Sequence, residues 1–185
     1  DTTMKKLLTL MSILWAANSM ALELVIGEER LEPGLVFIFE GAVKDHIQPS
    51  GLLHLKEHET HVHIEARANW DTKNTPKGTP GGGFVPYLHI TARVINQKTG
   101  LSTFIDVVPH INLVDNFHYA RNITLPGSIN DNYTVTFNII PPAHTELAIH
   151  RDWLNTYGKN LAKEQSYTYK DVDFSEVAKA SRIKK

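Results

Sequence analysis

The chain of 185 residues lacks cysteine and has only 3 methionines. Without cysteine it cannot be a disulfide scaffold, so its stability must come from an ordinary hydrophobic core. The formal net charge is −1 and no basic patch alternates with aromatics, which argues against a nucleic-acid partner. Hydrolase motifs and phosphate-binding glycine loops are also missing. Any transition-metal site must therefore use histidine, carboxylate or methionine, and the chain has 10 histidines.

Long apolar runs are missing too, except for one near the N-terminus. Met4 is followed by two lysines and the apolar run 7–17, with small residues at Ser19 and Ala21. This pattern predicts a secretory signal peptide cleaved after Ala21, with residues 1–3 upstream of it. A membrane anchor is the alternative, but the run is short for a spanning helix. We therefore expect an exported protein whose residues 22–185 form a single metal-binding domain.

Most of the remaining chain alternates apolar and polar residues, as strands do. We expect strands at residues 22–26, 35–39, 60–68, 87–96, 101–108, 133–140 and 166–174. Residues 72–83 are rich in glycine and proline and predict a loop, and only residues 175–185 carry a weak helical pattern. Several short strands with turns between them predict an all-β fold, an antiparallel β-sandwich.

The most informative segment is His61-Val62-His63-Ile64-Glu65, which alternates strictly. A strand sends successive side chains to opposite faces, so two imidazoles and a carboxylate share one face here. Imidazole and carboxylate ligands suit zinc, copper, iron or manganese. The alternative is the solvated face of an antiparallel sheet, and Arg67 on the same face fits that interpretation equally well.

Other histidines lie where strands are expected to end. Loops at one end of a sandwich converge, so these side chains are candidates to meet the first set; they are His110, His118, His144 and His150. We expect the remaining four to lie on the surface or behind the ligands; they are His46, His54, His58 and His89.

The order of several short motifs resembles the FetP family of periplasmic iron-transport proteins, over residues 34–152. The motifs are Val62-His63-Ile64-Glu65-Ala66, Gly83-Phe84-Val85-Pro86-Tyr87-Leu88, Pro109-His110, Phe117-His118-Tyr119, Tyr133-Thr134-Val135, Ile140-Pro141-Pro142 and His150-Arg151.

The resemblance implies an immunoglobulin-like β-sandwich that forms a homodimer with a copper site near the interface. It also implies a role in iron uptake beside an Ftr-type inner-membrane iron permease. The family's ligand positions fall on His63, Glu65, His110, His118 and His150. At His110 the family has methionine, and replacing a soft thioether with imidazole favours Cu(II), Zn(II) or iron over Cu(I).

These observations together predict a periplasmic metal-binding protein of iron uptake rather than an enzyme. Its metal would be copper, iron or both, with zinc and manganese as alternatives. A second hypothesis is a metalloenzyme like copper-zinc superoxide dismutase, although that family's cysteines are missing here. A third is a structural or adhesive sandwich without metal. Bound metal separates the third hypothesis from the others, and superoxide turnover separates the second from the first.

Overall fold

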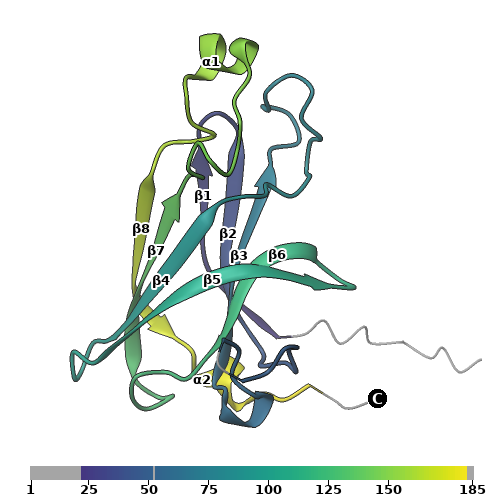
Figure 1. Ribbon diagram of the computed structural model, residues 1–185. Coiled ribbons are helices and arrows are strands. Elements are labelled where there is room, and N and C mark those ends of the chain that lie inside the picture. Colours follow the sequence, from purple (N-terminus) through teal and green to yellow (C-terminus); the bar gives the residue numbers. More distant parts are fainter. Residues whose placement is uncertain (1–21, 52, 183–185) are drawn as a thin grey trace, which may run out of the picture.

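The computed structural model describes residues 22–51 and 53–182, so the predicted signal peptide lies outside the described residues. Antiparallel strands dominate this part of the chain (Figure 1). The strands are β1 Glu23–Leu31, β2 Leu35–Ala42, β3 Val62–Trp70, β4 His89–Asn96, β5 Ser102–Asn112, β6 Asn116–Ile123, β7 Asn132–Ile140 and β8 Gln165–Asp173. The helices are the 3-10 helix η1 Glu57–Glu59, α1 Arg151–Tyr157 and α2 Ser175–Lys179.

The strands follow one another in the order β1-β2-β3-β6-β5-β4-β7-β8 and curl into a nearly closed sandwich. The first half of β5 pairs with β4, and its second half, from Val108 to Asn112, pairs with β6. This long strand therefore takes part in both sheets of the sandwich, the one that contains β6 and the one that contains β4. The predicted all-β sandwich is confirmed.

The core lies between the sheets and follows from the alternation in the sequence. Ile64, Ala66 and Ala68 of β3 are fully buried there, as expected from their spacing. Phe39 of β2 stacks on Phe137 of β7 with ring centroids 4.1 Å apart, which ties one sheet to the other. Burial of this apolar face fixes the register of β3, because a slip by one residue would turn its polar residues inward.

Two elements differ from the sequence predictions. Residues 116–119 lie outside the strands expected from the sequence, but they begin β6, at a tight turn in which Asn116 has a φ of 60°. Asparagine tolerates this left-handed conformation, so the chain reverses at once. The segment 151–157 forms the short helix α1, for which no pattern was noted. It packs Trp153 against Trp70, with ring centroids 6.4 Å apart.

The polar face of β3 is also covered at its N-terminal end. His63 and Glu65 are each 3% exposed, so the expectation of a solvated face does not hold for them. On one side, hydrogen bonds hold the segment 43–59, between β2 and β3, over this polar face. On another side, the tip of the β5–β6 hairpin covers the same face. Within residues 22–51 and 53–182, no helix is both long and apolar enough to cross a membrane.

Candidate metal centre

Strand register brings the polar side chains of three neighbouring strands together. His110 of β5 lies directly opposite His118 of β6, and His63 of β3 lies opposite Asn122 of β6. Side chains directly opposite each other project from the same face of a sheet. The twist of the sheet then carries β5 over the start of β3, so that residues far apart in sequence meet.

Three imidazoles form the centre of the site. His63, His110 and His118 each offer one ring nitrogen, and these nitrogens all lie within 4.8 Å of one another. Two imidazole nitrogens bound to one metal at about 2.0–2.1 Å each lie no more than about 4.2 Å apart. Three nitrogens around one ion lie closer together in pairs, at roughly 3.3–3.6 Å, so ring movements on the order of an ångström would bring all three onto one ion.

Hydrogen bonds decide which nitrogen of two of these rings is free. The Nδ1–H of His118 donates to the carbonyl oxygen of Asn116 over 2.9 Å, because a carbonyl can only accept. The Nδ1–H of His63 donates to Oδ1 of Asn122 over 2.7 Å. Both rings are thereby held in the tautomer that leaves Nε2 with a lone pair for a metal.

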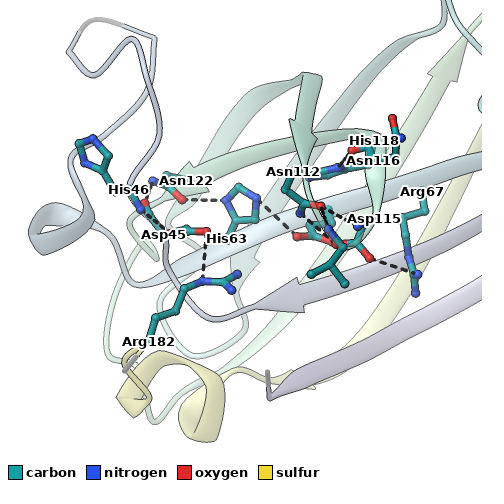
Figure 2. A network of polar contacts seen from close by, with 12 residues as sticks. Asp45, His46, His63, Arg67, Asn112, Asp115, Asn116, His118, Asn122 and Arg182 are labelled. Carbon is teal, nitrogen blue, oxygen red and sulfur yellow. Dashed lines mark hydrogen bonds and ion pairs between the residues drawn. The ribbon is translucent and has the colours of Figure 1, made fainter. Parts of the chain in front are cut away.

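Asn122 is the residue that fixes this arrangement (Figure 2). Its Nδ2 donates to the carbonyl oxygens of Asp45 and Leu55, over 2.9 and 3.1 Å. With the amide nitrogen engaged by two acceptors, Oδ1 must be the atom that faces His63. One buried side chain therefore orients a ring of the site and anchors the segment 43–59 that covers it.

Glu65 supplies a carboxyl group beside the imidazoles. Its Oε1 lies 3.5 Å from Nε2 of His63, and its buried Oε2 has no hydrogen-bond partner among the described residues. Burial, together with the charges of Asp115 and Glu40, raises the pKa of Glu65 to about 8. Without a cation, this carboxyl group is protonated at neutral pH.

An ionic network continues from Glu65 towards β2. Arg67 donates from Nη2 to Oε1 of Glu40 over 2.6 Å, and its Nη1 lies 3.7 Å from Oδ1 of Asp115 (Figure 2). Burial raises the pKa of Glu40, although Arg67 opposes that effect. Glu40 and Asp115 thus share one guanidinium beside Glu65, so this side of the site has few positive charges for its acidic groups.

The imidazoles of His63 and His110 are uncharged at neutral pH. Burial lowers the pKa of His63 to about 4. Burial and the neighbouring His63 lower the pKa of His110 to about 3. Neutral imidazole is the form that binds a metal, so at neutral pH no proton has to leave either ring first.

The residues present fit a transition-metal ion. Neither ring nitrogen of His110 has a hydrogen-bond partner in the described part of the chain, and both are buried. Oε2 of Glu65 is likewise buried without a partner. Buried polar atoms without partners cost free energy, and a bound cation would satisfy those that face it.

The structure brings four of the five predicted ligands together: His63, Glu65, His110 and His118. It places His150 elsewhere, exposed immediately before α1. This helix contacts Trp70 at the C-terminal end of β3, whereas His63 lies near the N-terminal end (Figure 1). Within one chain His150 lies far from the other four, and its role stays a prediction.

The other histidines divide into exposed and buried ones. His46, His58, His89 and His144 are exposed, while Nδ1 of His61 accepts a hydrogen bond from the backbone N–H of Leu125 over 3.1 Å. His54 is different, because it is only 7% exposed and its ring centroid lies 5.0 Å from that of His110.

Sequence reasoning missed Asn122, Glu40 and Asp115 as parts of the site. In residues 117–123, His118 and Asn122 stand four positions apart, which places both on one face of a strand. The asparagines just before this segment favour a loop instead, so the sequence did not predict β6. Nothing in the local sequence marks Glu40, since it follows an apolar run and becomes part of the site only through its pairing with Glu65.

Comparisons with known proteins agree with this geometry. Residues 20–176 match the family described as Fe²⁺ transport protein. The 34 kDa membrane antigen of Treponema pallidum is 31% identical over 135 residues, which cover 70% of this chain. The match spans only 63% of the length of that relative.

Solved structures show the same fold. A copper-bound variant of P19 from Campylobacter jejuni is 26% identical, with a TM-score of 0.65, and the match covers 80% of this chain and 96% of that one. FetP from uropathogenic Escherichia coli strain F11 is 25% identical, with a TM-score of 0.61, over 80% and 95% of the two chains.

The predicted resemblance to the FetP family is therefore confirmed, and the matching family is one of transport proteins rather than enzymes. The family profile covers most of the sequence, including all five predicted ligand positions. The metal-ligand geometry, the fold and the sequence profile agree, and the chain belongs to the Fe²⁺ transport protein family.

Proposed function

We propose that this protein is an exported, periplasmic metal-binding component of iron uptake that works with an inner-membrane permease of the Ftr type. It binds a divalent transition metal through His63, Glu65, His110 and His118. The observation that carries this proposal is the group of three buried imidazoles within 4.8 Å of one another, next to an unpartnered carboxylate oxygen. Family membership supports a role in iron transport.

Copper and iron are the proposed metals, and the donor set supports them. Imidazole is a borderline ligand that suits copper, iron and zinc, and a carboxylate adds affinity for harder ions such as Mn²⁺ and Fe²⁺. The P19 relative binds copper in its solved structure. With His110 in place of a thioether, the site favours Cu(II) over Cu(I).

Export to the periplasm rests on the N-terminal pattern of residues 4–21. The FetP relative was itself produced in the periplasm of Escherichia coli. Mass spectrometry of the exported protein is expected to show Leu22 as the first residue. A membrane-bound chain that retains Met4 would contradict this expectation.

Exposed apolar residues near the metal site support a homodimer. Ile111, Leu113 and Val114 at the tip of the β5–β6 hairpin are 65%, 105% and 88% exposed. Beside them, Phe84 and Phe117 line an apolar cavity of about 640 Å³. Such a patch is unusual on a monomer and typical of an interface. Sedimentation is expected to show a dimer in the parent protein and a monomer in Leu113→Lys.

Metal content after purification without chelator tests the proposal as a whole. We expect one bound transition metal per site, and competition among copper, iron, manganese and zinc identifies the preferred one. His63→Ala is expected to weaken binding by at least tenfold, since a direct ligand matters no less than its outer partners, which contribute about 10–100-fold. His61→Ala, one residue before β3, is the control and is expected to bind as the parent does.

Three results separate the alternatives. A parent protein that holds no transition metal would favour the structural or adhesive sandwich. Metal bound with superoxide turnover would favour the dismutase-like enzyme. Equal metal affinity in His63→Ala and the parent would place the site elsewhere.

A further inference from the structure

The three histidines of the metal site differ in whether a ring nitrogen that would not bind the metal has a hydrogen-bond partner. His63 donates its Nδ1–H to Asn122, and His118 donates its Nδ1–H to the carbonyl of Asn116. A histidine that ligates a metal almost always donates its other N–H to such an acceptor, which fixes the ring and strengthens it as a ligand. His110 has no acceptor on either nitrogen among the described residues.

One buried acceptor lies next to His110 without a partner. His54 is 7% exposed, and its Nδ1 is buried and has no hydrogen-bond partner in the described residues. Its ring meets that of His110 at 81°, with centroids 5.0 Å apart. The unpartnered Nδ1 of His54 therefore belongs to a ring in direct contact with the ring of His110, whose two nitrogens also lack partners among the described residues.

We propose that His54 is the positioning residue for His110, accepting the N–H of His110 on its Nδ1 when the other nitrogen of His110 binds the metal. The inference rests on the proposed function. It assigns a role to the loop 43–59, which carries His54 and is anchored through Asp45 and Leu55 to Asn122. Asn122 of β6 and His54 of the loop, which Asn122 anchors, then hold two of the three ligand rings.

The burial of His54 supports a polar role rather than simple packing. An imidazole buried without a hydrogen bond costs free energy that an apolar side chain of similar size would not cost. His54 lies outside the group of three imidazoles whose nitrogens fall within 4.8 Å of one another. Its ring instead contacts that of His110, the one ring of the three whose nitrogens lack partners among the described residues.

Substitutions at His54 in the full-length exported protein test the inference. Asparagine places its Oδ1 acceptor at the position of the imidazole Nδ1, whereas leucine offers no acceptor. We expect His54→Leu to weaken Cu(II) binding 10–100-fold and His54→Asn to stay within about threefold of the parent. His58→Leu, on the same loop with a side chain 76% exposed, is the matched control and is expected to bind as the parent does.

A second pair of variants guards against loss of folding. His54→Gln and His54→Asn are both polar, but glutamine carries its acceptor one bond further out. We expect His54→Asn alone to keep the parent's Cu(II) electron paramagnetic resonance spectrum, because only that variant holds His110 in place. Equal affinity in His54→Leu and the parent, or equally weak binding in His54→Asn and His54→Gln, would overturn the inference.

A control at the ligand distinguishes this inference from the proposed function. If His110→Leu weakens binding while His54→Leu does not, His54 has no positioning role and the metal site stands. If the parent itself binds no Cu(II), both proposals fail.

Discussion

The two halves of the polar face on β3 are built in opposite ways. In the imidazole half, two rings donate to neutral acceptors, an amide and a backbone carbonyl. In the carboxylate half, three acidic groups surround the single guanidinium of Arg67. Without an ion, the first half leaves the nitrogens of His110 without partners among the described residues, and the second half is short of positive charge. A divalent cation placed between His63 and Glu65 would use the lone pairs of one half and offset the charge of the other.

The proposed metal site lies where the imidazole half meets the carboxylate half of this face, because a cation there interacts with both. Burial raises the pKa of Glu65 to about 8, so the metal-free protein neutralises that carboxyl group with a proton. A metal ion that displaces the proton would leave Glu65 as a charged carboxylate close to the negative charges of Glu40 and Asp115. The site thus selects for a cation that accepts both nitrogen and oxygen ligands.

The largest effect is expected from removing the one cation of the carboxylate half. Arg67→Leu leaves Glu40, which is 2% exposed, without its partner, and breaking a buried pair costs about 3 kcal/mol. Urea unfolding of the metal-free protein measures this loss. Arg93→Leu on β4, where the side chain is exposed, is the control. A loss below about 1 kcal/mol, the range of surface ion pairs, would show that the carboxylate half needs no counter-charge.

Asn122→Leu tests the imidazole half. We expect metal affinity to fall 10–100-fold, because the ring of His63 loses the acceptor that fixes its tautomer. Two carbonyls of the covering loop also lose their donor, at a cost of about 1–3 kcal/mol each. Chelator competition and urea unfolding measure the two effects. Asn69→Leu, which removes a single bond to Gly82 elsewhere on β3, should leave affinity unchanged.

Sequence reasoning identified the proposed ligands of both halves but not the residues that support them. Alternation placed His63 and Glu65 on one face of a strand, because that depends only on the period of two. Which strand lies alongside depends on register, so Asn122 and Glu40 could not be assigned before β6 and the pairing of β2 with β3 were known. The burial of the polar face depends on a covering loop whose path no local pattern encodes.

The histidines of the covering loop show the same limit on what can be predicted from the sequence. His54 and His58 are four residues apart in one loop, yet one ring is buried against His110 and the other is exposed. Their sequence context gives no signal that separates them. The difference arises from the anchoring of the loop to Asn122 through backbone carbonyls. Carbonyl positions depend on the path of the backbone, which tertiary contacts decide.

The dependence of stability on pH distinguishes the halves in the metal-free protein. Glu65 keeps a proton in the folded state up to about pH 8, whereas the unfolded chain releases it near 4.5, so stability from this group falls as pH rises through that window. His63 and His110 bind protons in the unfolded chain near 6.5 but in the folded state only near 4 and 3. Their contribution is therefore lost as pH falls below 6.5.

Maximum stability of the metal-free protein is thus expected near pH 6.5. Each of the three groups changes the free energy of unfolding by about 1.4 kcal/mol per pH unit within its window. Two histidines outweigh one glutamate below pH 6.5, and only the glutamate acts above it. Glu65→Gln is expected to remove the decline between pH 6.5 and 8 while keeping the acid limb. An unchanged alkaline decline in this variant would show that Glu65 is not the responsible group.

The smallest effect is expected from His150, and it depends on whether two chains meet. Within one chain this residue lies near the Trp70 end of β3, far from His63, so His150→Ala should change the Cu(II) affinity of a monomer by less than about threefold, well below the effect of an outer partner. In a homodimer, the partner chain would bring its own copy of His150, the predicted fifth ligand, to the site. Affinity measured in the monomeric Leu113→Lys background and in the parent background separates these cases. A tenfold loss confined to the parent background would make His150 a ligand supplied across the interface, and a loss of that size in the monomer would contradict the position of α1.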